Sequence, residues 1–160
     1  MLGPHVRRWA YAQLLHDRAL LRRIMSRGVS RVEAMLLPVI MPIVVPTVRT
    51  ALRITPQSAQ RSIEHVRAIF GEVDERLRDG REFLVGGRFT AADLTFAALA
   101  APVLFPAGGG ASYPALDDVP DAMRQEALQL RDSAAGRFAL RLFAQERGRA
   151  RHIRHVSLPA

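Results

Sequence analysis

The stretch FLVGGRFTAADLTFAAL, residues 83–99, strongly specifies the start of one helix. Thr90 is placed to cap that helix, because its hydroxyl can accept a hydrogen bond from the backbone N–H of Asp93. The Asp93 carboxylate can reach back to the N–H of Thr90, which completes a capping box at the positive end of the helix dipole. Phe89 and Leu94 stand where a hydrophobic staple would close over this turn. We therefore predict a structural role, and no catalytic one, for these four residues.

The segment that follows the cap, ADLTFAALAAP, is almost entirely apolar. A helix that is apolar on every side is normally surrounded by other elements of the protein. Its terminal N–H groups must then find hydrogen-bond partners within the protein. The sequence therefore predicts an all-α fold, a helical bundle built around a central helix over residues 90–101.

The rest of the chain also has helical patterns and no convincing strand. A first helix is expected over 5–25, and two shorter helices over about 121–131 and 134–146. The best specified helix begins at Pro56, with Thr55 as its N-cap. Its apolar residues recur at steps of three and four and form one seam: Ala59, Ile63, Val66, Phe70, Val73 and Leu77. This helix is predicted to pack against the core.

Residues 34–48, AMLLPVIMPIVVPTV, form an apolar run that contains Pro38, Pro42 and Pro46. Each proline inside a helix removes a backbone hydrogen bond and costs about 3 kcal/mol. We therefore expect a kinked or broken helix within an enlarged hairpin over 25–53. The run is too short and too rich in proline to predict a membrane span. A buried hairpin or subunit contact is the first interpretation, and peripheral membrane contact through 34–48 is the alternative, since the flanking arginines could meet lipid head groups.

Composition limits the function classes. The chain has 160 residues and a net charge of +8, and all of its basic residues other than histidine are arginines. The arginines are scattered and aromatic residues are few, which argues against nucleic-acid binding. The absence of cysteine excludes disulfides, a cysteine nucleophile and thiolate metal sites, and it fits a cytoplasmic location. His152 and His155 have the spacing of metal ligands but lie among arginines, so no metal site is predicted.

The sequence FLVGGRFTAADLTFAALAAPV resembles the signature of the C-terminal all-helical domain of glutathione S-transferases. In that family a "yLvGd-x-x-T-x-A-D" stretch leads into the central helix. The matching residues are Leu84, Val85, Gly86, Thr90, Ala92 and Asp93. Gly87 stands where the family often has Asp. The resemblance extends more weakly over most of the chain from Gly3 to Phe143, with 25–53 as an enlargement, and implies one helical domain over 1–147 followed by a basic flexible tail over 148–160.

The resemblance implies a share in glutathione conjugation. In this family the C-terminal domain supplies a wall of the hydrophobic-substrate pocket and much of the dimer surface. By position along the first helix, the candidates for that wall are Trp9, Tyr11 and Gln13. The alternative is a purely structural role, in which Trp9 and Tyr11 pack against the core of the domain.

The family's glutathione site lies mostly on an N-terminal thioredoxin-like domain that activates the thiol, and nothing in this sequence resembles it. Glutathione is therefore expected as a co-substrate only together with that domain, and no cofactor is expected on this chain alone. Alone, the chain should be catalytically silent. The expected partners are a second copy, in a homodimer, or a thioredoxin-like domain. The alternative function is a non-enzymatic docking module with the same fold.

Overall fold

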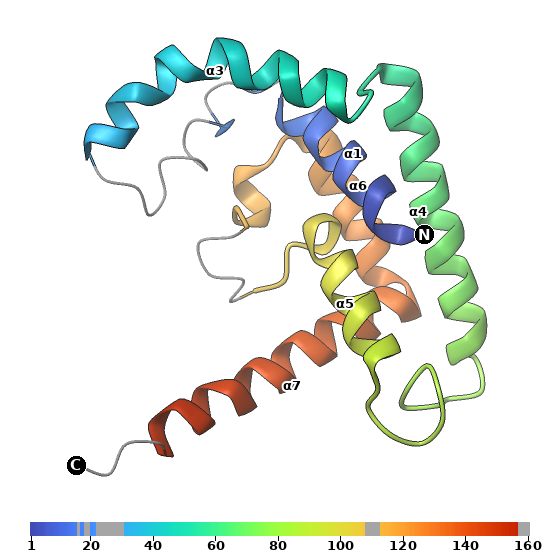
Figure 1. Ribbon diagram of the computed structural model, residues 1–160. Helices are drawn as coiled ribbons and strands as arrows, with labels where there is room; N and C mark the ends of the chain where they lie inside the picture. Colours follow the sequence, from blue (N-terminus) through green and yellow to red (C-terminus); the bar gives the residue numbers. More distant parts are fainter. Residues whose placement is uncertain (16, 18–19, 22–30, 108–112, 157–160) are drawn as a thin grey trace.

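A computed structural model describes residues 1–15, 17, 20–21, 31–107 and 113–156, and within these ranges it contains helices and no strand (Figure 1). The elements are α1 (Leu2–Leu14), α3 (Arg31–Ala51), α4 (Pro56–Leu77), α5 (Ala91–Leu104), a short 3₁₀ helix η2 (Leu116–Asp118), α6 (Asp121–Asp132) and α7 (Ala134–Val156). The predicted all-α fold is confirmed.

Helix α5 is the centre of the bundle. It contacts α1, α6 and α7, and α1 in turn packs along α4 (Figure 1). The buried side chains of α5 are Asp93, Phe96, Ala97, Ala100, Ala101, Val103 and Leu104. The Phe96 ring touches Phe70 of α4 and Phe138 of α7, with ring centroids 5.4 and 6.3 Å apart. One side of this apolar helix therefore lies in the core as its composition predicts, whereas six of its fourteen residues are exposed, so the helix is not surrounded on every side.

Helix α4 begins as the sequence predicts. Thr55 is its N-cap: the Thr55 hydroxyl accepts from the N–H of Ser58 at 3.0 Å, and the Ser58 hydroxyl accepts from the N–H of Thr55 at 2.9 Å. The predicted seam is buried from Ala59 to Val73, and Leu77 is partly buried against the core. This seam holds α4 against α1 and α7.

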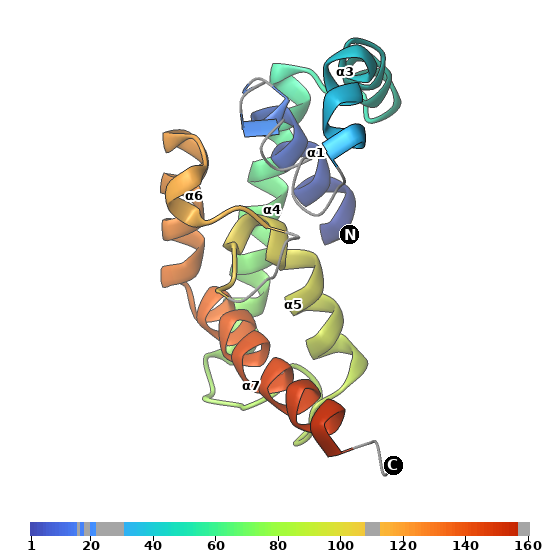
Figure 2. The same ribbon diagram turned by 90° about the vertical axis from the view of Figure 1, so that its left-hand side faces the viewer.

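Helix α3 does not contain the predicted break. Residues 31–51 form one helix in spite of the three prolines, and the other expectation, a kink, stays a prediction. Because the prolines are four residues apart, the hydrogen bonds that they remove lie on nearly one stripe, and the remaining bonds hold the helix. The chain turns at Arg53, where φ is 49°, and enters α4. Figures 1 and 2 show α3 at the outer edge of the molecule, with its N-terminal half extending away from the other helices.

The C-terminal segment also differs from the prediction. Residues 148–156, expected to be a flexible tail, continue α7 to Val156, while 157–160 lie outside the described residues. Arginine, which occurs three times in residues 148–156, has high helix propensity.

No single helix in the described part of the chain is long and apolar enough to cross a membrane. Val39–Ala51 and Pro56–Leu77, bent by 61° relative to one another, meet that criterion only when taken together.

Candidate functional site

The three residues predicted for a substrate wall lie on two faces of α1. Trp9 is only 4% exposed and belongs to the hydrophobic core. Trp9 and Gln13 both line a small pocket of about 260 Å³ between α1 and the start of α4. Tyr11 is 39% exposed and does not line that pocket. The structure therefore brings Trp9 and Gln13 together and places Tyr11 apart from them.

A larger pocket lies between the N-terminal halves of α1 and α5 and the residues that follow α3. Its volume is about 850 Å³. The lining residues are Met1, Leu2, Gly3, Pro4, Arg7, Arg8, Ala51, Leu52, Ala91, Ala92, Thr95, Phe96 and Leu99. We call this the α1–α5 pocket. Its volume is within the range of sites that bind small molecules.

The chemistry of the α1–α5 pocket is apolar with cationic groups from one side. Leu2, Phe96 and Leu99 supply hydrophobic surface, and the arginines of α1 supply two guanidinium groups. Such a lining suits a ligand with an apolar body and an anionic group. The Cβ of an alanine at Gly3 would come within 3.1 Å of the Leu99 side chain, so glycine keeps α1 close to α5 at this pocket.

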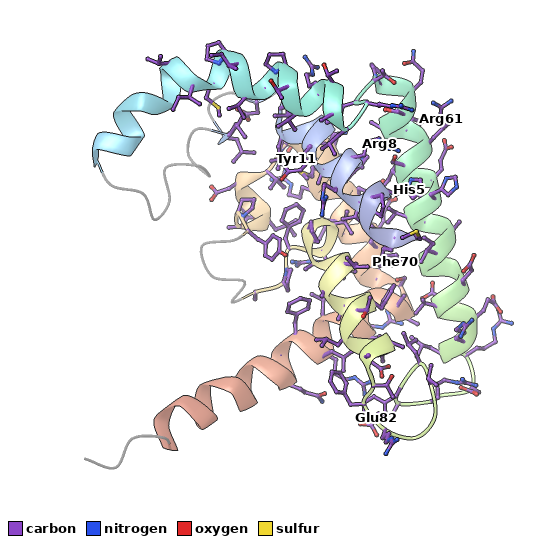
Figure 3. The ribbon with its side chains drawn as sticks, viewed as in Figure 1. His5, Arg8, Tyr11, Arg61, Phe70 and Glu82 are labelled. Carbon is purple, nitrogen blue, oxygen red and sulfur yellow. The ribbon has the colours of Figure 1, made fainter. Side chains whose placement is uncertain are left out.

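Arg8 also supports the pocket wall. Its Nε donates to the carbonyl oxygen of Leu52 at 2.9 Å, and a terminal nitrogen donates to the hydroxyl of Ser62 at 3.4 Å. These bonds join α1 to the segment between α3 and α4 and to α4 itself. Tyr11, one helical turn beyond Arg7, lies on the same stripe of α1 as the pocket arginines (Figure 3). Of the predicted wall residues, Tyr11 is thus the one on the same side of α1 as this pocket.

The start of α5 is fixed by Asp93, which is fully buried. Thr90 and Asp93 form a capping box. One carboxylate oxygen of Asp93 accepts from the backbone N–H and the hydroxyl of Thr90 at 2.7 and 2.8 Å. The other oxygen accepts from the backbone N–H of Leu84 at 2.7 Å. Burial raises the pKa of this carboxyl, but the three hydrogen bonds outweigh that effect and hold the pKa below its usual value.

The two residues of the predicted hydrophobic staple, Phe89 and Leu94, differ in burial. The Phe89 ring packs edge-on against Phe83, with centroids 6.3 Å apart, and is partly buried against the core. Leu94 is 55% exposed. The staple between Phe89 and Leu94 stays a prediction.

The region around this cap was compared with known protein families. Residues 56–124 match the family model described as "Glutathione S-transferase, C-terminal domain". This part of the chain is similar to the C-terminal domain of glutathione S-transferases. The match begins at the first residue of α4 and includes all of α5 with its capping box. Comparisons with curated proteins and with solved structures found no match.

Two histidines, one on α1 and one on α4, form a contact that the sequence does not reveal. The His5 ring of α1 stacks on the His65 ring of α4, with centroids 4.4 Å apart and planes 9° from parallel. His5 Nδ1 lies 3.4 Å from the Ser62 hydroxyl. Burial lowers the pKa of His5, and the positive charges of His65, Arg8 and the N-terminus lower it further. Since the two rings are far apart in sequence, only the packing of α1 on α4 brings them together.

Among the described residues of the chain, no group of three or more His, Cys, Asp or Glu side chains is placed to hold a metal ion. The side chains of His152 and His155 lie outside the described residues.

Proposed function

We propose that this domain forms a wall of the hydrophobic-substrate pocket in a glutathione transferase-like protein. The observation that carries the proposal is the α1–α5 pocket, an apolar pocket of about 850 Å³ in a chain whose residues 56–124 match the family's C-terminal domain. Its apolar lining suits a hydrophobic electrophile, and burial of such a molecule removes apolar surface from water.

Within this proposal, Leu2, Phe96 and Leu99 contact the apolar body of the electrophile. Arg7, which is exposed at the pocket, attracts an anionic group such as a carboxylate of the conjugate. Tyr11 extends the same face of α1 by one turn and offers an apolar ring with a polar tip.

The proposal assigns no step of thiol activation to this chain. That step requires a group that stabilises a thiolate, and we propose that a thioredoxin-like domain supplies it, with glutathione as the co-substrate. A homodimer in the cytoplasm is proposed as the working assembly. The chain alone is expected to be inactive.

The test uses the native protein that carries this domain, isolated from its source cells, and measures conjugation of glutathione to 1-chloro-2,4-dinitrobenzene. A Leu99→Trp substitution should fill the α1–α5 pocket and raise the KM for the electrophile about tenfold, while the KM for glutathione stays unchanged. Leu128→Trp, at an exposed leucine of α6 outside the pocket, is the matched control. Absence of conjugation, or equal kinetics of the two variants, would refute the proposal.

A second candidate function is a docking module without transferase activity. The observation that favours it is the exposed apolar surface of α3, which the transferase proposal does not use. The two candidates differ in glutathione dependence, since a docking module would show no conjugation in the native protein and no affinity for glutathione.

A further inference from the structure

The surface of α3 is unusually apolar for an exposed helix. Side chains of α3 are described for 39–51, and none of them is buried. Val39 is 71% exposed, Ile40 46% and Ile43 70%. Pro42 and Pro46 are exposed beside them. We call these five residues the α3 apolar surface.

Helices of this composition are normally covered. Helix α5 is comparably apolar and has seven of its fourteen residues buried in the bundle, whereas α3 extends along the outside (Figure 1) and none of its described side chains is buried. Contiguous apolar side chains left in water are a sign of a surface that meets a protein or a membrane. The α3 apolar surface therefore needs a partner that the bundle does not supply.

The charged residues that follow this surface in the sequence, up to Glu64, are all of one sign. Between Glu33 and Glu64 the sequence contains no Asp or Glu. Arg49, Arg53 and Arg61 fall in that interval and are exposed. The apolar surface is thus followed by a cationic segment, and its partner should be apolar with an anionic border.

A second copy of the chain meets this requirement less well than a lipid surface does. If two α3 helices paired in parallel along their apolar surfaces, Arg49 of one copy would face Arg49 of the other, and the one carboxylate of α3, Glu33, could meet an arginine only in an antiparallel pair. An anionic lipid surface offers both the acyl region and the negative head groups.

The geometry favours a helix that lies on the membrane and does not cross it. Residues 34–48 reach about 22 Å at 1.5 Å per residue, which is less than the hydrocarbon thickness of about 30 Å. The carbonyls of Pro38 and Pro42 lack an N–H partner four residues later, because Pro42 and Pro46 have none, and such carbonyls need water. The adjoining helix α4 cannot complete a span, since its apolar seam is buried in the core.

We propose that α3 inserts the α3 apolar surface into the outer layer of an anionic bilayer, with the following arginines at the head groups. Arg8 holds the C-terminal end of α3 on the bundle through the carbonyl of Leu52, so the whole domain would dock with the helix. This proposal does not depend on the transferase function.

The experiment is sedimentation of the full chain with vesicles of phosphatidylglycerol and phosphatidylcholine, compared with phosphatidylcholine alone. Binding is expected to the anionic vesicles and to weaken as salt rises. Ile43→Glu should reduce binding at least about tenfold, because it places a charge in the apolar layer. Leu128→Glu makes the same kind of change at an exposed leucine of α6, a helix that Figure 2 shows apart from α3, and it should leave binding unchanged. Arg53→Gln should weaken binding about fivefold at low salt.

A second measurement uses the absence of cysteine in the chain. A polarity-sensitive fluorophore on Ile43→Cys should shift to the blue on anionic vesicles, and the same label on Leu128→Cys should not. Equal binding of Ile43→Glu and the unchanged chain, or equal binding to neutral and anionic vesicles, would overturn the proposal. So would a concentration-dependent dimer that Ile43→Glu abolishes, since that result would assign the surface to a second copy.

Discussion

A single carboxylate, that of Asp93, ties the loop before α5 to the first turn of the helix. It accepts one hydrogen bond from Leu84 and two from Thr90, with no exposure to solvent. Asp93→Asn should lower the free energy of unfolding by about 1–3 kcal/mol, because the substitution removes the charge and leaves a buried N–H without its acceptor. Urea unfolding measures this change. An unchanged midpoint would contradict this role.

The matched control is Thr55→Ala at the exposed cap of α4, where about 0.5–2 kcal/mol is expected. The pH dependence gives an independent check. The pKa of Asp93 in the folded chain lies below its value in the unfolded chain. The Asp93 carboxylate therefore adds its full contribution to the free energy of unfolding above a pH of about 4, and this contribution is lost as the pH falls through the folded pKa. In Asp93→Asn, the free energy of unfolding should therefore fall less steeply at acidic pH than in the unchanged chain.

The stacked histidines predict pH dependence in the neutral range. The folded pKa of His5 is below the ordinary value, first because of burial and then because of neighbouring positive charge. The unfolded chain therefore takes up this proton at higher pH than the folded chain. The contribution of neutral His5 to the free energy of unfolding should be fully present above a pH of about 6.5 and should decline as the pH falls below that value.

His5→Phe keeps a ring against His65 but cannot be protonated, so the decline between pH 7 and 5 should become smaller. The effect should stay below about 1 kcal/mol, since the pair is partly exposed and screened by solvent. Thermal melts at pH 8 and pH 5 measure it. An unchanged pH dependence in the variant would show that other groups cause the decline.

At the scale of elements, α6 and α7 cross so closely that one position requires glycine. A Cβ at Gly136 would lie 1.9 Å from the carbonyl oxygen of Leu130. Gly136→Ala should lower stability by at least about 2 kcal/mol, because backbone atoms would have to move. Gly71→Ala, on the exposed side of α4 with nothing near its Cβ, should raise stability by about 0.5–1 kcal/mol. Chemical denaturation of the two variants should show opposite signs, and a common sign would contradict this packing.

The elements also show what the sequence can predict. The cap at Thr55, the seam of α4 and the core helix after Thr90 follow from local patterns, and the structure contains all three. The three prolines of α3 predicted a kinked or broken helix. That prediction summed the free-energy cost of each proline and did not consider where along the helix the lost hydrogen bonds lie. Their spacing of four places them on one stripe, and the helix continues.

At the scale of the whole molecule, the candidate site was harder to predict than the fold. The α1–α5 pocket depends on how two helices far apart in sequence approach one another. No local pattern marks Phe96 or Leu99 as pocket residues, since their apolar character is equally that of core residues. Trp9 shows the opposite case: its position along the first helix suggested a pocket wall, but its side chain is part of the core, as the alternative interpretation expected. Helix identity follows from periodicity, whereas the walls of a cavity follow from packing.

The exposed position of α3 leads to a last prediction about how stability is distributed over the molecule. Ile43 of α3 is 70% exposed and Ile63 of α4 is 3% exposed, although both are isoleucines within apolar helical patterns. Ile63→Ala should lower the free energy of unfolding by about 2–5 kcal/mol, because it leaves a cavity among α1, α4 and their neighbours. Ile43→Ala should change it by less than about 0.5 kcal/mol, since the side chain contributes little to the core. Urea denaturation of the two variants compares the same deletion at two sites. A large loss from Ile43→Ala in the absence of lipid would mean that α3 is covered in solution, and the membrane proposal would then lose its basis.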